Sequence, residues 1–445
     1  MDKTDTYGRR KILIRLMIGI GFLIFLIVGI SSCNFPDFPD LISGNKPTEL
    51  PGEVENSPTP APSSTPNTPS LKSKDLIIWV PPQFDPGDNS VAGDLFLSRM
   101  DEFTSRRPQT DIQVRVKALS GEQGLLESLR TTRAAAPIIL PDLIALPRSL
   151  MEDAINSGLV LPLNDVTEVL DGDDWYGYAS ELSLVNDQVV GIPFAGDLLV
   201  LSYKNDTGEI PPPDWNAVLK TKKVLAFPAS DPRSLVTLAH YQSLGEEITN
   251  EAGETDLLQE PLMEVLTYYQ QAQAANVMPY WLTQFETDDQ AWQSYQERQS
   301  TLAITWSSTL LGSDSANTEL AAMPTKEGKA FAYAEGWVWC VVPSDPDAEQ
   351  IAVELAEFLT TESYLSAWTI QAGYLPVRPS GLESWSEETS YSTISQLLPT
   401  AVLIPDLGTS KEIGLDIRDA VVAVLKDQVE PSTALADLFE STQVP

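Results

Sequence analysis

The chain has 445 residues and a formal net charge of −35, because 63 Asp and Glu residues outnumber 28 Lys and Arg residues. A surface this acidic repels nucleic acid and anionic lipid headgroups, so we expect neither as a partner. One histidine, His240, and two cysteines, Cys33 and Cys340, weaken the case for a serine or cysteine triad and supply too few ligands for zinc. We therefore expect no metal ion and no cofactor.

The first residues of the chain have the layout of an export signal. Basic residues come first, an apolar run covers residues 16–30, and the run ends in Ser31-Ser32-Cys33. This ending resembles the bacterial lipobox, in which the cysteine is lipidated and becomes the first residue after cleavage. We expect residues 1–32 to be a signal peptide and Cys33 to anchor the protein on the outer side of the cell membrane. The alternative is an uncleaved transmembrane anchor, which also leaves the body outside the cytoplasm.

Residues 33–73 are rich in Pro, Ser, Thr and Asn. These residue types cannot bury much apolar surface and favour extended conformations, so we expect a lipidated cysteine followed by a disordered tether. The roughly 370 residues that remain exceed what one hydrophobic core usually serves. The sequence therefore predicts two lobes.

The body begins with alternating strand and helix patterns. Strands are expected at residues 76–80, 112–116, 140–146 and 158–163, and helices at 96–103, 125–129 and 150–157. This alternation is typical of an open α/β sheet.

A second α/β pattern follows a break at Gly191, Pro193 and Gly196, where a crossing between lobes would need a bend. Strands are expected at residues 224–228, 301–306, 320–324 and 335–342, and helices at 235–244, 262–275, 348–361 and 362–372. Cys340 lies in a strand-like run, which favours a buried, inert thiol. His240 shares a helix with leucines and is expected to be packed, and residues 413–424 form a helical packing face.

Several short motifs occur in a fixed order along the body. They are the first strand ending in Trp79, Phe103 to Pro108, Leu140-Pro141-Asp142 with Gly158-Leu159, Gly191-Ile192-Pro193 with Tyr203-Lys204-Asn205, Leu302 to Trp306, Gly336-Trp337, Ala356 to Thr360 and Ala372 to Pro376. This order resembles that of the family-one extracellular solute-binding proteins, the maltose-binding-protein-like receptors of ABC importers. The ordered set is specific for the family and not for the ligand.

This resemblance implies an α/β, two-lobe periplasmic-binding-protein-like fold of type II with three hinge crossings. The crossings are expected near residues 192–197, 323–333 and 373–377. One lobe would comprise residues 74–193 plus 334–372, and the other residues 194–324 plus 375–445. The resemblance also implies a monomeric, non-enzymatic receptor that traps a sugar or oligosaccharide by hinge closure and delivers it to ABC transporter permease subunits.

A sugar site needs aromatic side chains for the apolar ring faces, and carboxylates and arginines for the hydroxyls. The predicted ligand-binding residues, chosen at strand ends, crossings and family positions, are Trp79, Asp142, Asp197, Asp231, Arg233, Trp306, Trp337 and Tyr374. Each also has a structural interpretation. The tryptophans could pack in the core, the aspartates could cap helices, form turns or pair with a lysine, and Tyr374 could serve the hinge.

Two other functions stay open from the sequence. The many Asp and Glu residues are compatible with an extracellular glycoside hydrolase that uses paired carboxylates. A ligand-sensing lipoprotein of the same fold would present its ligand state to another protein rather than to a permease. Peptide, polyol or glycerol phosphate derivatives are alternative ligands, although the acidic surface disfavours a polyanion.

Overall fold

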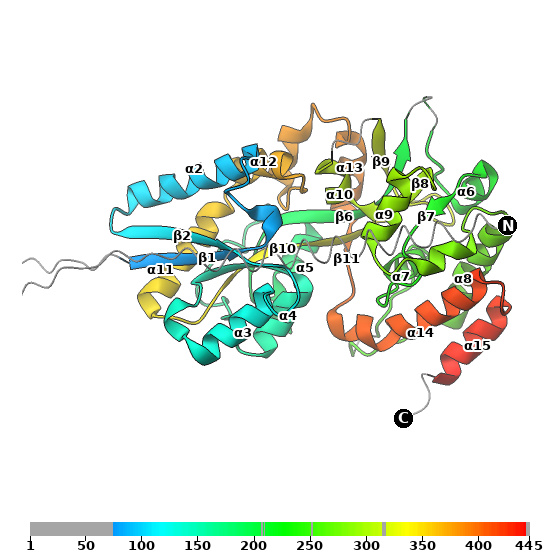
Figure 1. The fold of residues 1–445 in the computed structure, drawn as a ribbon, viewed down its shortest axis with the longest axis horizontal. Coiled ribbons are helices and arrows are strands. Elements are labelled where there is room, and N and C mark those ends of the chain that lie inside the picture. The colour runs from blue at the N-terminus through cyan, green and yellow to red at the C-terminus, as the bar shows by residue number, and fades with distance from the viewer. Residues whose placement is uncertain (1–73, 206–207, 209, 251, 314–316, 442–445) are drawn as a thin grey trace, which may run out of the picture. The chain divides into compact units, whose positions relative to one another are not determined.

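The structure, a computed structural model, describes residues 74–205, 208, 210–250, 252–313 and 317–441 (Figure 1). The predicted signal peptide, the lipidated Cys33 and the tether lie outside these residues. Within the described ranges, no helix is both long and apolar enough to cross a bilayer.

The first half of the body is built on three parallel strands. They are β1 (Lys74–Val80), β2 (Thr110–Val116) and β3 (Leu143–Pro147), in the order β2-β1-β3. The helices that follow them are η1 (Pro82–Phe84), α2 (Val91–Arg106), α3 (Leu125–Ala135), η2 (Pro137–Ile139) and α4 (Arg148–Asn156). The strands and helices expected from the sequence in this half are confirmed, except for one strand.

The strand expected at residues 158–163 is wrong. Leu161 and Leu163 each donate one backbone hydrogen bond, to the carbonyl oxygens of Val341 at 2.9 Å and Val189 at 2.7 Å. The two acceptors lie on different strands, β10 and β5, so the two contacts do not form a ladder with one partner.

Alternate residues of β1 face opposite sides, because successive side chains of a strand point to opposite faces. Leu76 and Ile78 belong to the core cluster that includes residues of α2, whereas Trp79 belongs to the cluster that includes residues of α3 and α4. Figure 1 shows α2 and α3 on opposite sides of these strands. A strand that is covered on both faces has a continuous run of apolar residues. The apolar run at residues 76–80 therefore predicted β1 correctly.

The strand β6 (Ile192–Lys204) joins the two halves of the body. Its first part pairs with β10 (Tyr333–Val341), and its second part pairs with β8 (Leu302–Trp306) and β9 (Thr318–Ala321). The resulting sheet has the order β2-β1-β3-β10-β6-β8-β7, where β7 is Leu225–Ala226. Figure 1 shows β6 running from one half into the other. The sequence predicted that the strand is interrupted near Pro193, but β6 is continuous through this residue. The register of its pairing with β10 shifts between Trp337 and Val338.

The remaining elements cover the sheet. They are α5 (Gly177–Leu182), β4 (Leu184–Val185), β5 (Gln188–Val189), α6 (Trp215–Thr221), α7 (Leu235–Gln242), α8 (Gln259–Ala274), η3 (Tyr280–Gln284), α9 (Asp288–Gln296), α10 (Ser307–Leu311), α11 (Pro346–Leu359), α12 (Glu362–Ala372), η4 (Pro379–Trp385), α13 (Tyr391–Leu397), η5 (Leu398–Thr400), β11 (Val402–Leu403), α14 (Leu407–Leu425) and α15 (Pro431–Ser441). Contacts join α14 and α15 to α8. The lobe boundaries stay a prediction, and η4, which the second predicted lobe includes, packs against α12 of the first.

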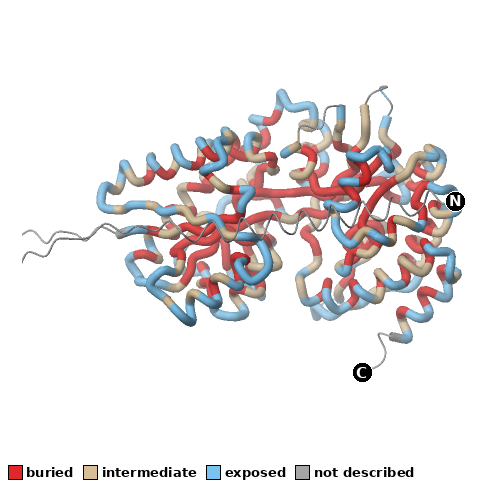
Figure 2. Tube along the Cα trace, viewed as in Figure 1, coloured by how far each residue is buried: buried red, intermediate tan, exposed pale blue. Residues whose placement is uncertain are grey.

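Two residues singled out in the sequence are packed in the interior. Figure 2 shows that buried chain runs through the middle of the body and exposed chain lies mostly at its periphery. Cys340 is fully buried, as predicted, and burial raises the pKa of its thiol. His240 is also fully buried, with its Nδ1 atom 2.9 Å from the hydroxyl oxygen of Tyr269. Burial lowers the pKa of His240 to about 3, so the ring is neutral at pH 7. The prediction of a packed histidine is confirmed.

Three chain segments meet at Gly196 of β6. Gly196 is paired with Gly336 of β10, and it exchanges two backbone hydrogen bonds of 2.8 Å with Leu375. A Cβ atom on Gly336 would lie 2.5 Å from the carbonyl oxygen of Ala195 and 2.7 Å from a methyl carbon of Leu182. The close approach of these segments therefore requires a residue without a side chain at Gly336.

We predict that Gly336→Ala destabilises the body, because backbone atoms must move to admit the methyl group. The free energy of unfolding should fall by about 1–3 kcal/mol, the usual range for overpacking. Urea unfolding followed by tryptophan fluorescence measures this change. Gly177→Ala is the matched control, since a Cβ atom there has nothing within 4 Å. Equal stability of the two variants would contradict the prediction.

Candidate functional site

A cavity of about 470 Å³ lies where the two halves of the body face each other across β6 and β10. One wall comes from the loop after β2 and the start of α4, and the other from the segment before α7, the start of α9 and the end of β8. The strands β6 and β10 and the segment at Tyr374 supply the base. The lining residues are Leu119, Ser120, Pro147, Ser149, Leu150, Asp197, Arg233, Thr287, Asp288, Asp289, Trp306, Ser308, Thr309, Glu335, Trp337 and Tyr374.

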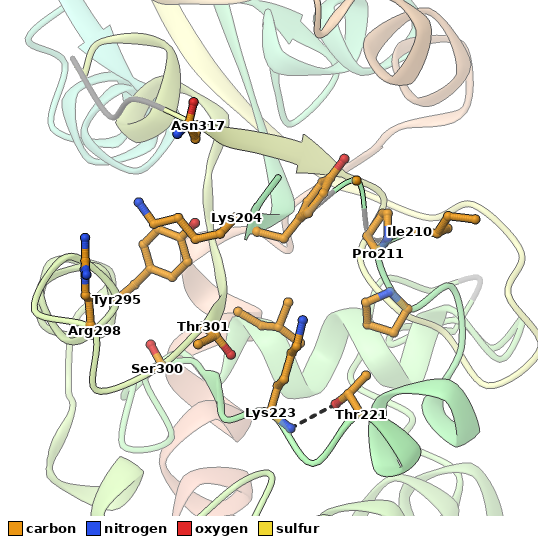
Figure 3. A pocket seen from close by; sticks show the side chains of 14 residues that line it. Lys204, Ile210, Pro211, Thr221, Lys223, Tyr295, Arg298, Ser300, Thr301 and Asn317 are labelled. Carbon is orange, nitrogen blue, oxygen red and sulfur yellow. Dashed lines mark hydrogen bonds between the residues drawn. The ribbon is translucent and has the colours of Figure 1, made fainter. Parts of the chain in front are cut away.

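A larger cavity of about 980 Å³ lies beside the end of β6 (Figure 3). Its lining includes Lys204, Lys223 and Arg298, and Lys204 lies over the ring of Tyr295 at 5.3 Å. None of the predicted ligand-binding residues lines it. The smaller cavity is the better candidate, because aromatic rings, carboxyl groups and a guanidinium converge there.

The smaller cavity brings together five of the eight predicted residues. Asp197, Arg233, Trp306, Trp337 and Tyr374 all line it, although they come from β6, β8, β10 and two connecting segments. Their common position follows from the sheet, because β10, β6 and β8 are adjacent strands.

Asp231 lies directly behind the lining. Its Oδ1 atom accepts a hydrogen bond from the N–H of Arg233 at 3.0 Å, and its Oδ2 atom accepts one from Leu235 at 3.1 Å. The carboxylate thus satisfies backbone donors at the beginning of α7. The Nε atom of Arg233 is 3.9 Å from Asp231 Oδ1, so Asp231 also holds the guanidinium electrostatically.

Trp79 and Asp142 do not line the cavity. Trp79 is 1% exposed and packs in the core beside α3 and α4. Asp142 accepts hydrogen bonds from the N–H of Ile77 at 2.8 Å and from the hydroxyl of Ser344 at 3.2 Å. The sequence shows that a residue lies at a strand end but not which face of the sheet its side chain occupies. The side chains of Trp79 and Asp142 contact the surrounding fold and not the cavity.

Asp197 is held rigidly at the base of the cavity. Its Oδ1 atom accepts hydrogen bonds from the Ser307 hydroxyl at 2.6 Å and from the Ser308 N–H at 2.9 Å. The N–H of Leu198 lies 3.0 Å from the same oxygen, and the Ser308 hydroxyl donates to Oδ2. Burial raises the pKa of Asp197, while these donors oppose that shift by stabilising the carboxylate.

Asp288, at the start of α9, was not predicted from the sequence. Its Oδ2 atom accepts a hydrogen bond of 3.1 Å from the indole N–H of Trp306, which fixes the plane of that ring. Burial, with repulsion from Asp231, raises the pKa of Asp288 to about 6 against the opposing effect of Arg233. Thr287 and Gln290 form a capping box at the start of α9. This pair in the sequence could have indicated that Asp288 lies at the beginning of a helix.

Glu335, on β10, was also not predicted. It is paired directly with Asp197 of β6, and in the described part of the chain no hydrogen-bond donor contacts its carboxyl group. Burial raises the pKa of Glu335 to about 7, with a further contribution from Asp197. A charged residue inside an otherwise apolar strand was the signal that could have identified it.

The tryptophans expose little surface to the cavity. Trp306 is 9% exposed and Trp337 is 8% exposed. Trp337 packs edge-on against Phe84 at 5.0 Å, and the ring of Tyr374 lies 5.2 Å from the same phenylalanine. These contacts hold the rings of Trp337 and Tyr374 in place at the cavity lining.

The loop that carries Arg233 is supported from the C-terminal part of the chain. A Cβ atom on Gly414 of α14 would lie 2.2 Å from the carbonyl oxygen of Pro232 and 2.9 Å from Cα of Arg233. The hydroxyl of Ser234 donates a hydrogen bond of 2.8 Å to the Gly414 carbonyl. Helix α14 therefore packs directly on this loop.

The chain resembles several solved structures in fold. It has a TM-score of 0.69 and 16% identity to the maltose-binding periplasmic protein MalE of Listeria monocytogenes in complex with maltose, over 83% of this chain and 97% of that one. For the maltose-bound MalE3 of T. maritima, the TM-score is 0.64 and the identity is 17%, over 83% of this chain and 99% of that one. For the cyclic alpha-maltosyl-1,6-maltose binding protein of Arthrobacter globiformis, the TM-score is 0.68 and the identity is 15%, over 83% of this chain and 97% of that one. These structures confirm the predicted two-lobe fold.

No curated protein matches the chain in sequence. The profile of a family described as bacterial extracellular solute-binding protein matches residues 98–390, which is well over half of the chain. The matched segment includes both walls and the base of the cavity. The chain therefore belongs to the bacterial extracellular solute-binding proteins.

Proposed function

We propose that this protein is an extracytoplasmic receptor that binds a sugar or oligosaccharide in the cavity between its two halves. The observation that carries the proposal is the composition of that cavity. Trp306 and Trp337 line it together with the carboxyl groups of Asp197 and Glu335 and the guanidinium of Arg233. A volume of about 470 Å³ is within the range of small-molecule sites.

Capture requires a change in the distance between the cavity walls. The walls come from different halves of the body, and the halves are joined through β6, β10 and the segment at Leu375. Bending at these crossings would bring the walls together around the ligand. The closed form would then deliver the sugar to the permease subunits of an ABC importer. The structurally similar proteins named above bind maltose or a cyclic maltosyl sugar, which supports a carbohydrate ligand.

The hydrogen bonds at Asp197 disfavour this carboxylate as the nucleophile or base of a glycoside hydrolase. A hydrolase needs a carboxylate that can attack the sugar or activate water. Both oxygens of Asp197 already accept hydrogen bonds from Ser307, Ser308 and Leu198. A carboxylate in this setting is suited to orienting a ligand hydroxyl. Members of the family are solute-binding proteins, in agreement with this interpretation.

The family is extracellular, so the body works outside the cytoplasm. We further propose that Cys33 is lipidated after removal of residues 1–32 and that residues 33–73 tether a monomeric body to the membrane. At no more than about 3 Å per residue, this tether reaches tens of ångströms. A receptor held at the membrane reaches its permease without loss by diffusion. A sensor of the same fold would carry the same anchor, and the partner protein would distinguish the two.

We predict that Trp306→Ala and Trp337→Ala each weaken carbohydrate binding about 2- to 12-fold, which corresponds to the 0.5–1.5 kcal/mol of an aromatic contact. Isothermal titration calorimetry against a panel of oligosaccharides measures the dissociation constants. Trp281→Ala is the control, because Trp281 is half-buried and does not line the cavity. Unchanged affinity in both cavity variants would contradict the proposed site.

We predict that Cys33→Ser moves the protein from the membrane fraction to the soluble extracytoplasmic fraction in a bacterium that processes lipoproteins. The reason is that a serine carries no thiol for lipid transfer. Fractionation and immunoblotting provide the measurement, and Cys340→Ser is the control. Retention of the Cys33→Ser protein in the membrane, at full length, would favour the uncleaved transmembrane anchor instead.

A further inference from the structure

Negative charge predominates in the cavity. Four carboxyl groups line it, those of Asp197, Asp288, Asp289 and Glu335, and the only lysine or arginine among the lining residues is Arg233. Arg233 in turn faces Asp231 behind the lining, at 3.9 Å. The positive charge is therefore shared with a carboxylate outside the cavity, and the lining keeps an excess of acidic groups.

The four carboxyl groups differ in their hydrogen bonds. Asp197 accepts bonds from three residues, and Asp288 accepts one from Trp306. Glu335 has no such donor among the described residues, although it is paired with Asp197 on the neighbouring strand. Like charges opposite each other on adjacent strands repel. Glu335 is thus a partly exposed carboxyl group that accepts no hydrogen bond from the described residues and lies beside a second carboxyl group.

A neutral hydroxyl and an ammonium group differ in what they can do at this position. A hydroxyl donates a hydrogen bond but leaves the repulsion between Glu335 and Asp197 unchanged. An ammonium group donates up to three hydrogen bonds and also offsets the negative charge, which makes charge-assisted bonds about twice as strong as neutral ones. The cavity therefore discriminates between these groups by charge as well as by hydrogen bonding.

We propose that the cavity selects a carbohydrate carrying a protonated amino group, with Glu335 as its principal acceptor and Asp197 and Asp288 as the surrounding negative charges. This inference rests on the proposed function, because it names the class of sugar for the same site. The raised pKa of Glu335, about 7, agrees with it, since the empty cavity favours a proton where the ligand would supply a cation.

Two matched sets of disaccharides test this inference at pH 7 and low salt. One set is chitobiose, N,N′-diacetylchitobiose and cellobiose, and the other is 6-amino-6-deoxymaltose with its N-acetyl derivative and maltose. In the set whose linkage fits the cavity, we expect the amino compound to bind at least tenfold more tightly than its acetylated or hydroxyl counterpart. Calorimetry gives the dissociation constants directly on the unmodified protein.

The outcomes separate the two proposals. Equal or weaker binding of the amino compound would overturn the selectivity for a cationic sugar and leave the carbohydrate receptor intact. Absence of binding by every compound, amino or neutral, would overturn both. Glu335→Gln should reduce the preference for the amino compound to about twofold or less, and the exposed Glu387→Gln, with the same charge change, should keep it.

The unliganded protein offers a test of Glu335 that needs no sugar. Its pKa is raised from 4.5 to about 7, so between these values the folded chain binds more protons than the unfolded chain. The stability contributed by protonation is present below pH 4.5 and is lost as the pH rises through about 7. Arg233 and Arg148 oppose this shift, and Asp197 and Asp288 reinforce it.

We therefore predict that Glu335→Gln raises the thermal unfolding midpoint at pH 8 relative to the parent protein, with a smaller gain at pH 5. The uncharged amide lacks the repulsion that the parent carboxylate has at the higher pH. Scans at both pH values measure the difference, with Glu387→Gln as the control. A gain that does not grow between pH 5 and pH 8 would show that Glu335 is not a buried, repelled carboxylate.

Discussion

The pairing of β6 with strands from both halves is the constraint on which the structure depends. Residues 192–198 bond to β10 and residues 199–204 bond to β8 and β9, so one strand completes two sets of ladders. Its first eleven residues are buried, and buried backbone groups need partners at all times. Relative motion of the halves must therefore leave both ladders intact. Gly196, which pairs with Gly336 and exchanges two backbone hydrogen bonds with Leu375, lies within the first of these ladders.

The same constraint explains the chemistry of the cavity. Asp197 and Glu335 lie opposite each other where β6 and β10 pass from one half to the other. Two carboxyl groups placed together in a partly dry site destabilise the empty protein. A ligand that satisfies them recovers that free energy as affinity. Because both groups sit on strands that run between the halves, a ligand at the proposed site would contact these strands directly.

The sequence predicted most of the fold and part of the site, for identifiable reasons. Strand β1 and helix α2 were recognised because they are buried on faces that give clear apolar periods. The motif order placed Trp306 and Trp337 among the predicted ligand-binding residues, and both line the cavity. Glu335 and Asp288 were missed because their role depends on pairing across strands and on the start of α9, which no local pattern encodes. Trp79 looked like Trp306 in the sequence, and only the sheet shows that it faces α3 and α4.

The packing of Gly414 against the loop of Arg233 gives helix α14 a part in positioning a residue of the cavity lining. The family profile ends at residue 390, before α14 begins at Leu407. The guanidinium in the cavity is thus buttressed by a segment that the shared family pattern does not cover. A side chain added at Gly414 would collide with this loop and displace Arg233. The position of a charged group in the cavity therefore depends on a residue that does not line the cavity.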